Sequence, residues 1–332
     1  MKNVEPLIQV INLKKYFPVK LGLLKSLFSK QTLYVRAVDD VSFSIAPSQV
    51  LGLVGESGCG KTTTGRCLLR LIEPTSGQIF FKKTDLTRLT EDEMRKMRRY
   101  LQIIFQDPYE SLNPRMSIYD ILAEPLQLQH ITEDIDEILD LTSKALEEMG
   151  MVPPEEFLYR FPHELSGGQR QRVAIARAFI LHPQFIVADE PVSMLDASMR
   201  TEVTELILKM VQKLHCGFLY ITHDIALTRY ICDKIAVMYL GKIVETGVTD
   251  DVLTHPYHPY TQALINAVPV PDPTSKRGEI VIKGEVPSPI NPPSGCRFHP
   301  RCPYAKDKCK REEPELVKVG KDHYVACHFP LE

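Results

Sequence analysis

The sequence lacks several features that would place it in a special class of protein. No apolar run approaches the ~18 residues that a membrane-spanning helix needs. The first residues lack the apolar core of a secretory signal peptide. The net charge of −2 gives none of the basic surplus that nucleic-acid-binding domains usually carry. No heptad pattern is sustained. We therefore expect a cytosolic protein that contacts a membrane only through a partner.

What is present is the composition of an ordinary folded protein. The chain has 332 residues, which is long enough for one large or two ordinary domains. Of these residues, 44% are hydrophobic and 25% are charged, as in soluble globular proteins. Strand and helix patterns alternate up to about residue 250, which predicts an α/β fold with a largely parallel sheet. Strands are predicted at 7–11, 34–45, 50–54, 77–81, 101–105, 185–188, 217–221 and 235–240, and helices at 61–72, 91–99 and 170–181. The helical pattern at 117–159 predicts an insertion, and 19–32 a loop insertion.

One glycine-spaced stretch carries the clearest chemistry. Gly55–Thr62 follows an apolar strand, has the form G-x-x-x-x-G-K-T and runs into a helix. Glycines let backbone N–H groups converge on an anion, and the helix end adds partial positive charge. Lys61 is placed to reach the β- and γ-phosphates of a nucleotide, and the Thr62 hydroxyl to ligate Mg²⁺. The residues predicted to surround the phosphates are Gly55, Ser57, Gly58, Cys59, Gly60, Lys61, Thr62 and Thr63.

A second strand ends in two adjacent carboxylates. Phe185–Ala188 is apolar and is followed by Asp189 and Glu190. Beside a phosphate loop, Asp189 is the expected Mg²⁺ ligand and Glu190 is placed to polarise the attacking water. Successive side chains of a strand point to opposite faces, so the two carboxylates can hold separate roles.

A third stretch, Leu165-Ser166-Gly167-Gly168-Gln169, precedes the predicted helix 170–181. Ser166 can cap that helix, and the glycines leave its N–H groups open to an anion. A second helix end suited to phosphate is unexpected in one chain unless it completes a site on another chain, and an ordinary N-cap with a flexible entry is the alternative.

With these motifs the chain resembles the nucleotide-binding subunits of ATP-binding cassette (ABC) transporters. Residues 165–169 match the diagnostic signature of that family and stand between the phosphate loop and the Asp-Glu strand, as the family requires. Gln106 matches the Q-loop glutamine, Asp196 lies in a D-loop-like stretch and His223 matches the switch histidine. Phe17 lies where the family places an aromatic ring against adenine, with Tyr16 as the weaker candidate.

The resemblance implies a RecA-like P-loop fold with an antiparallel β subdomain and an α-helical insertion at about 107–172. It also implies that two subunits pack head to tail around two ATP molecules. Each ATP would then contact Lys61 of one chain and Ser166, Gly168 and Gln169 of the other. Glu190 would activate water, His223 would hold the γ-phosphate, and Gln106 would contact Mg²⁺ and sense the membrane partner.

The composition changes near residue 250, since 13 of the 25 prolines follow Asp251. Long helices and central strands are therefore not expected there. The segment 255–260, the proline-rich 269–273 and the stretch 289–303 resemble the C-terminal extension of oligopeptide and dipeptide importers. The sequence thus divides into an ATPase domain, 1–250, and an extension, 251–332. Gln169-Arg170-Gln171-Arg172 resembles the F-type subunit of these importers rather than its D-type partner.

The eight cysteines fall into two groups. Four are scattered singly through periodic segments and are predicted to be small buried hydrophobes: Cys59, Cys67, Cys216 and Cys232. The other four cluster in the extension with the spacing C-x5-C-x6-C-x17-C: Cys296, Cys302, Cys309 and Cys327. This spacing fits neither zinc sites nor bacterial ferredoxins and indicates only a metal or a cluster. In the resembled family the four hold a [4Fe-4S] cluster. Because three histidines lie nearby (His299, His323 and His328), a mixed-ligand zinc site is an alternative, and four unligated thiols are another.

The predicted protein is an ATPase and translocase subunit that uses ATP and Mg²⁺ to drive peptide uptake. The resemblance implies two membrane permeases, a second cassette of the D type and an extracytoplasmic solute-binding protein as partners. It places the chain peripherally on the cytoplasmic face of the inner membrane, with no nucleic-acid partner. Similar cassettes serve transporters of nickel, opines or sugars, so the sequence does not decide which solute is transported. It also does not decide whether the partner cassette is a second copy of this chain or a different one. An ABC ATPase acting on nucleic acid, or a subunit with a degenerate site, is the weaker alternative.

Overall fold

A computed structural model describes residues 5–19, 33–268, 282 and 284–332. The predicted loop insertion, from residue 20 to residue 32, and the proline-rich linker lie outside the described residues. The contacts of the chain form two compact units. We call Met1–Leu7, Ile45–Gln49 and Arg88–Tyr220 the helical unit, and Ile8–Ser44, Val50–Thr87 and Ile221–Glu332 the sheet unit. The division at residue 250 stays a prediction.

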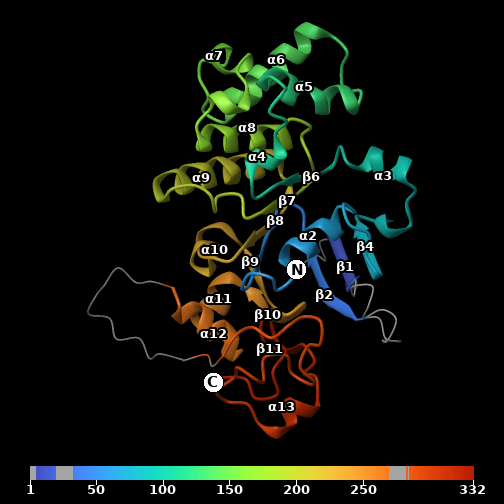
Figure 1. Ribbon diagram of the computed structural model, residues 1–332, viewed down its shortest axis with the longest axis vertical. Coiled ribbons are helices and arrows are strands. Elements are labelled where there is room, and N and C mark those ends of the chain that lie inside the picture. The colour runs from blue at the N-terminus through green and yellow to red at the C-terminus, as the bar shows by residue number, and fades with distance from the viewer. Residues whose placement is uncertain (1–4, 20–32, 269–281, 283) are drawn as a thin grey trace, which may run out of the picture. The chain divides into compact units, whose positions relative to one another are not determined.

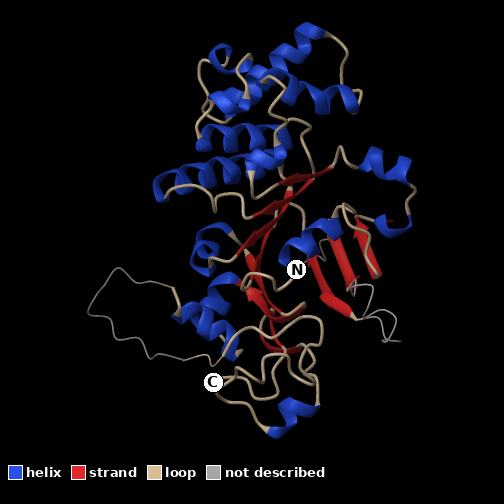
Figure 2. Cartoon of the chain, viewed as in Figure 1, coloured by secondary structure: helices blue, strands red, loops and turns tan. Residues whose placement is uncertain are grey.

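The sheet unit contains an antiparallel sheet, visible as a separate group of red arrows in Figure 2. Its strands are β1 (Ile8–Pro18), β2 (Tyr34–Ile45), β4 (Ser76–Phe81) and β5 (Thr84–Asp85), in the order β2-β1-β4-β5. Buried and exposed side chains alternate at the start of β1, as expected for a strand with one face on the core. The strand predicted at 7–11 in fact continues to Pro18, so Phe17 lies in β1.

A second, mixed sheet of this unit holds the phosphate loop. Strand β3 (Val50–Val54) is buried throughout and pairs in parallel with β9 (Lys234–Tyr239), with Leu53 opposite Ala236. Strand β10 (Lys242–Val248) returns antiparallel to β9. The C-terminal hairpin of β11 (Val317–Gly320) and β12 (His323–Val325) then pairs with β10 through β12. The sequence pattern missed these antiparallel strands, which bring the extension onto the sheet of the phosphate loop.

The helices of the sheet unit are short. They are α2 (Lys61–Leu68), α10 (Ile225–Ile231), α11 (Thr249–Thr254), α12 (Pro259–Asn266) and α13 (Asp307–Arg311). The prediction that the helix after the phosphate loop reaches residue 72 was wrong. It ends at Leu68, because Arg70 adopts a left-handed backbone conformation with φ of 47° and its guanidinium donates to Leu86 O and Glu73.

The helical unit carries a parallel strand pair, β6 (Leu101–Ile104) and β7 (Phe185–Asp189). Strand β8 (Gly217–Thr222) begins in this unit. Its helices follow one another along the chain, and α5 to α8 form one group in Figure 1. They are α3 (Glu91–Met97), α4 (Pro108–Ser111), α5 (Ile118–Leu128), α6 (Ile135–Glu148), α7 (Glu155–Leu158), α8 (Gly167–Phe179) and α9 (Ala197–Leu214). Short 3₁₀ turns lie at Leu86–Arg88 and Pro162–Glu164.

Local sequence signals set where these helices begin. Ser117 and Asp120 form a capping box at α5, and Asp134 caps α6. The predicted helical segment is thus confirmed as three helices, α5, α6 and α7. Apolar residues at helical spacing pack between them, among them Ile121 and Leu146, which are 1% and 0% exposed.

Two further sequence predictions can be compared with the structure. Cys59, Cys67, Cys216 and Cys232 are at most 8% exposed, which confirms that they are buried. Among the residues the structure describes, no helix is both long enough and apolar enough to cross a membrane.

Two glycines of the phosphate loop are required by close backbone approach. A Cβ atom on Gly60 would lie 2.1 Å from Ala37 O, and one on Gly55 would lie 2.2 Å from Met238 O. Gly60 also has a φ of 110°, where residues other than glycine are strained. Gly58 has a φ of 77° as well, but nothing lies within 4 Å of its added Cβ. A side chain at Gly60 would therefore cause both backbone strain and a steric clash, whereas one at Gly58 would cause strain alone.

Replacing Gly60 with Ala should destabilise the protein by more than about 3 kcal/mol, because strain and a clash with the Ala37 carbonyl add. Gly58→Ala should cost only the strain, about 1 kcal/mol. Urea denaturation followed by circular dichroism measures both. Equal losses for the two variants would contradict the tight approach at Gly60.

Candidate functional site

The phosphate loop lies in the sheet unit, between β3 and α2. Gly60 precedes the first residue of α2, so the loop leads directly into a helix N-terminus. Lys61 is 5% exposed, and its Nζ donates to Gly55 O at 2.7 Å and to Glu56 O at 3.0 Å. The ammonium group therefore lies inside the curve of its own loop. Phosphate oxygens can take over these donors, since a lysine ammonium offers three N–H groups as a compact charge.

His223 follows β8 in the same unit and is exposed. The next residue, Asp224, accepts hydrogen bonds from the N–H groups of Ala226 and Leu227 and so caps α10. The backbone on both sides of His223 is thus held, by β8 before it and by the cap of α10 after it.

The two aromatic candidates for adenine have different surroundings. The Tyr16 hydroxyl donates to the Asp39 carboxylate, and burial together with this hydrogen bond raises the pKa of Tyr16 to about 12. Phe17 has no polar group to satisfy, and Lys15 Nζ lies 4.9 Å from the centre of its ring. That Phe17 is the ring that stacks on a base stays a prediction.

In the helical unit the pairing of β6 with β7 aligns two predicted catalytic residues. The parallel register sets Ile104 opposite Ala188, so the residues two positions beyond them meet at one strand edge. Gln106 Nε2 donates to Glu190 Oε2 at 3.2 Å. Glu190 has a φ of 47°, an uncommon conformation that turns the chain immediately after β7. Asp189 is the last residue of the buried strand and is 3% exposed.

Helix α8 begins at Gly167, inside the signature stretch and three residues before the predicted start, with Ser166 as its cap, as predicted. Ser166 Oγ accepts from Gln169 N at 3.3 Å, and Gln169 Oε1 accepts from Ser166 N at 2.9 Å, which forms a capping box. Ser166 and Gly167 are exposed, whereas a Cβ on Gly168 would collide with Met199 of α9. The start of the helix is therefore exposed at Ser166 and Gly167, and the Met199 side chain of α9 lies against Gly168.

Asp196 begins the next helix, α9. It accepts from Met199 N at 3.0 Å and from Ser198 Oγ at 2.8 Å, and these hydrogen bonds lower the pKa of the Asp196 carboxyl. Ser193, three residues earlier, donates to Glu190 O at 3.0 Å. The D-loop-like stretch is thus tied to the residue predicted to activate water.

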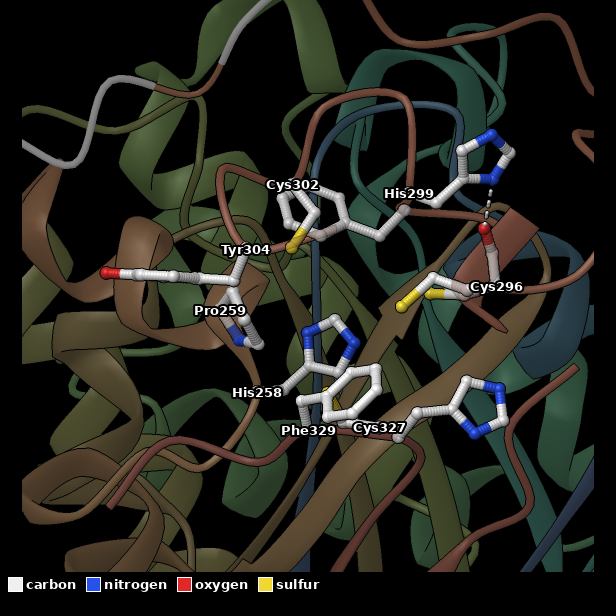
Figure 3. A pocket seen from close by; sticks show the side chains of 11 residues that line it. His258, Pro259, Cys296, His299, Cys302, Tyr304, Cys327 and Phe329 are labelled. Atoms are coloured by element: carbon white, nitrogen blue, oxygen red, sulfur yellow. Dashed lines mark hydrogen bonds between the residues drawn. The ribbon is translucent and has the colours of Figure 1, made fainter. Parts of the chain in front are cut away.

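The four C-terminal cysteines line one pocket of the sheet unit, together with His258, His299 and His328 (Figure 3). Burial, with a smaller contribution from the neighbouring thiols, raises the pKa of Cys296, Cys302 and Cys327 to about 11. His299 Nδ1 lies 2.9 Å from Cys296 O. Within the described ranges no three metal-ligand side chains stand in an arrangement that could hold an ion. The sequence predicted the grouping, and metal binding remains a proposal.

Sequence reasoning missed a set of ion pairs between the extension and the rest of the sheet unit. Arg301 donates to both carboxylate oxygens of Glu56, at 2.7 and 3.1 Å. Arg297 donates to Asp39 and to Leu240 O. Burial tends to raise the pKa of Asp39, but the Tyr16 hydrogen bond and the Arg297 charge outweigh it and lower the pKa. The partners lie 245 and 258 residues apart, and no local pattern signals such pairs.

A third carboxylate, Glu245 of β10, is fully buried. It accepts from Tyr257 N at 2.7 Å and His258 N at 3.0 Å, and its Oε1 lies 2.8 Å from His323 Nε2. His258 is buried too, and desolvation lowers its pKa to about 4. The neutral His258 ring accepts from Tyr260 N through Nδ1. Glu245 therefore ties the start of α12 and the C-terminal hairpin to the sheet.

Two family models match this chain. The model described as ABC transporter matches residues 38–193, and the model described as oligopeptide/dipeptide transporter, C-terminal region, matches residues 244–309. Among solved structures, the ATP-binding cassette MJ0796, a dimer bound to ADP and Pi, is 26% identical with a TM-score of 0.63. It covers 73% of this chain and 98% of its own. Fold and phosphate loop together thus define an ABC-type ATPase.

Curated relatives extend over nearly the whole sequence. The oligopeptide transport ATP-binding protein AppF of Bacillus subtilis is 46% identical over 333 residues, 98% of each chain. A putative peptide import ATP-binding protein of Brucella ovis is 48% identical over 322 residues, 97% of each chain. The chain therefore belongs to the oligopeptide/dipeptide family of ABC transporter ATP-binding subunits.

Glu245 offers a direct measure of how strongly the extension is attached. Glu245→Gln should lower the free energy of unfolding by about 2 kcal/mol, because an amide nitrogen replaces one oxygen that accepts backbone hydrogen bonds. Glu315→Gln, an exposed carboxylate of the same extension, is the matched control and should change it by less than about 0.5 kcal/mol. Equal denaturation midpoints for both variants would show that the buried cluster does not hold the extension.

Proposed function

We propose that this chain is the ATP-hydrolysing subunit of an importer that takes up oligopeptides or dipeptides across the cytoplasmic membrane. One observation carries the proposal. This chain contains the phosphate loop and the Asp-Glu pair after a strand, each with all of its predicted residues, and it also contains the matched peptide-transporter region at 244–309. The names of the curated relatives point the same way. The boundaries 1–250 for the ATPase domain, about 107–172 for its helical insertion and 251–332 for the extension belong to the proposal.

The proposed roles follow from the chemistry of each side chain. Lys61 and the loop N–H groups bind the phosphates of ATP. Thr62 and Asp189 supply the hydroxyl and carboxylate oxygens that Mg²⁺ prefers, and Gln106 adds a third oxygen ligand. Bound Mg²⁺ would neutralise charge on the β- and γ-phosphates. Glu190 polarises the attacking water, His223 contacts the γ-phosphate, and Phe17 stacks on adenine.

The second half of the ATP site comes from another cassette. The exposed start of α8 offers Ser166 and free helix N-terminal dipoles to an anion, and Gly168 and Gln169 complete that end. Asp196 begins the neighbouring helix and is exposed as well. We propose a head-to-tail dimer in which this F-type chain pairs with a D-type homologue.

The remaining partners are two integral membrane permeases and, through them, an extracytoplasmic solute-binding protein. The chain would lie peripherally on the cytoplasmic face of the inner membrane. The alternative solutes are nickel, an opine or a sugar, because the permeases and the binding protein select the cargo. A nucleic-acid ATPase is the weaker alternative, since the chain has a net charge of −2 and no coiled-coil pattern.

Substitution of Glu190 by Gln tests the ATPase assignment. The amide keeps the shape but removes the base that polarises water, so hydrolysis should fall by about 10²–10⁴-fold while ATP binding is retained. ATP turnover of the purified importer and uptake of labelled peptide into cells are measured together. Glu202→Gln, an exposed carboxylate on α9, is the control and should leave both unchanged. Undiminished hydrolysis by Glu190→Gln would refute the role of Glu190, and normal peptide uptake by cells that carry it would refute the peptide assignment.

We further propose that Cys296, Cys302, Cys309 and Cys327 hold a [4Fe-4S] cluster, with Zn²⁺ as the alternative. Their chemistry fits: four thiols line one pocket, and the thiolate is the form that binds either group. Binding would require that the thiols lose their protons and turn toward one another. The cluster would supply a covalent crosslink to a segment that otherwise has few helices and strands.

Anaerobic purification should yield brown protein with about four iron and four sulfide per chain. Cys302→Ser and Cys327→Ser should each lose most of the iron, whereas Cys232→Ser, a buried cysteine outside the pocket, should keep it. Colourless protein with about one zinc per chain would instead favour the zinc alternative. Protein that contains neither metal would refute the site.

A further inference from the structure

The phosphate loop of the sheet unit contains an acidic residue, Glu56, directly after Gly55. A loop that binds a triphosphate gains nothing from a negative charge of its own, because like charges close together repel. The Glu56 side chain is 27% exposed, so solvent screens its charge only in part. The loop therefore needs a partner that neutralises this carboxylate.

Arg301 of the extension supplies that charge. Its guanidinium contacts the Glu56 carboxylate with two N–H groups, at 2.7 and 3.1 Å, in the paired geometry that arginine favours with carboxylates. The Arg301 side chain is 8% exposed and lies over the Tyr239 ring, 5.8 Å from its centre. Such a shielded contact is screened far less by salt than a surface ion pair.

The backbone of Glu56 is held from the same direction. Glu56 N–H donates to the Tyr260 hydroxyl at 2.9 Å, and Tyr260 is fully buried in α12. Glu56 O in turn accepts from Lys61 Nζ at 3.0 Å. Glu56, which the extension contacts through Arg301 and Tyr260, therefore also accepts a hydrogen bond from the phosphate-binding lysine.

Arg301 is carried by a closely hydrogen-bonded turn. Its own N–H and that of Cys302 both donate to Phe298 O, at 2.9 and 3.0 Å. Phe298 is 1% exposed and packs against Tyr239 and Tyr260, with ring centres 5.2 and 5.4 Å away. The guanidinium is thus placed in advance rather than recruited when nucleotide binds.

We infer that Arg301 is a positioning residue for ATP, which acts through Glu56 by neutralising and orienting the one carboxylate of the phosphate loop. Through this contact the peptide-transporter extension contributes to nucleotide affinity. The inference rests on the proposed function in one respect, that the loop binds ATP. Because ATP is bound both before and during hydrolysis, a loss of Arg301 raises Kd and KM and leaves kcat nearly unchanged.

The test is titration calorimetry of the full-length chain with Mg-ATP. Arg301→Met keeps the apolar stem and removes the charge, and should weaken ATP binding about tenfold, because the Glu56 carboxylate is then unpaired near the phosphates. Arg311→Met, an exposed arginine of the same extension, is the matched control and should bind ATP like the parent chain.

The decisive variants change Glu56. In the Arg301→Met background, Glu56→Gln should restore affinity to within about threefold of the parent, because the unpaired charge is gone. Glu56→Gln alone should bind ATP more tightly than the parent, since Arg301 then adds an unopposed positive charge. A purely structural role of Arg301 predicts the opposite, a loss that Glu56→Gln does not restore.

The outcomes separate the two proposals. A parent chain that does not bind Mg-ATP would refute the proposed function. A parent that binds, with Arg301→Met unchanged or not rescued by Glu56→Gln, would overturn the inference alone. Should Arg301→Met fail to fold, Glu56→Gln decides by itself: tighter binding supports the inference, and equal or weaker binding overturns it.

Discussion

Three carboxylates of the sheet unit depend on groups that the extension supplies. Asp39 is 5% exposed and pairs with Arg297, Glu245 is fully buried beside His323, and Glu56 pairs with Arg301. A carboxylate taken out of water is costly unless it is paired or hydrogen-bonded. The sheet unit therefore needs the extension, residues 251–332, for electrostatic reasons as well as for packing. The extension is an integral part of this unit.

The phosphate loop is held in shape by contacts on two sides, of which the extension supplies one. On one side, Gly55 and Gly60 lie so close to backbone carbonyls that no other residue fits. On the other side, the Glu56 carboxylate is hydrogen-bonded to Arg301, and the Glu56 N–H group is hydrogen-bonded to the Tyr260 hydroxyl. Between these fixed points Lys61 lies inside the loop. An anion that enters finds its donors already arranged, so little ordering cost remains to be met on binding.

The parts that sequence predicted well are those with local causes. The strand, loop and helix around Gly55–Thr62, the cap at Ser166 and the strand that ends in Asp189 each follow from residue types a few positions apart, and each of these local structures is confirmed. The register of β6 and β7 also explains why Gln106, predicted only from resemblance, reaches Glu190. The end of α2 was wrong because the left-handed conformation of Arg70 depends on contacts of its side chain, which helix propensity does not encode.

What the sequence did not reveal has long-range causes. Strand β10 was overlooked because its residues Glu245 and Thr246 interrupt the apolar pattern. Its buried carboxylate makes sense only once β12 and the start of α12 are beside it. In the same way, Arg297 and Arg301 are, in the sequence, two arginines next to cysteines with no predictable partners. Only the fold brings Asp39 to Arg297 and Glu56 to Arg301. Nothing within a window of ten or twenty residues predicts such a pair.

The two halves of the proposed ATP site are consequently stabilised in different ways. The signature end is held by contacts three residues apart, as between Ser166 and Gln169, or between Asp196 and Met199. The phosphate loop is held by contacts that span 204 and 245 residues, from Glu56 to Tyr260 and to Arg301. A change in the extension would therefore act on the loop of its own chain. It would leave the capping of the signature helix as it is, because that capping depends on residues only three positions apart.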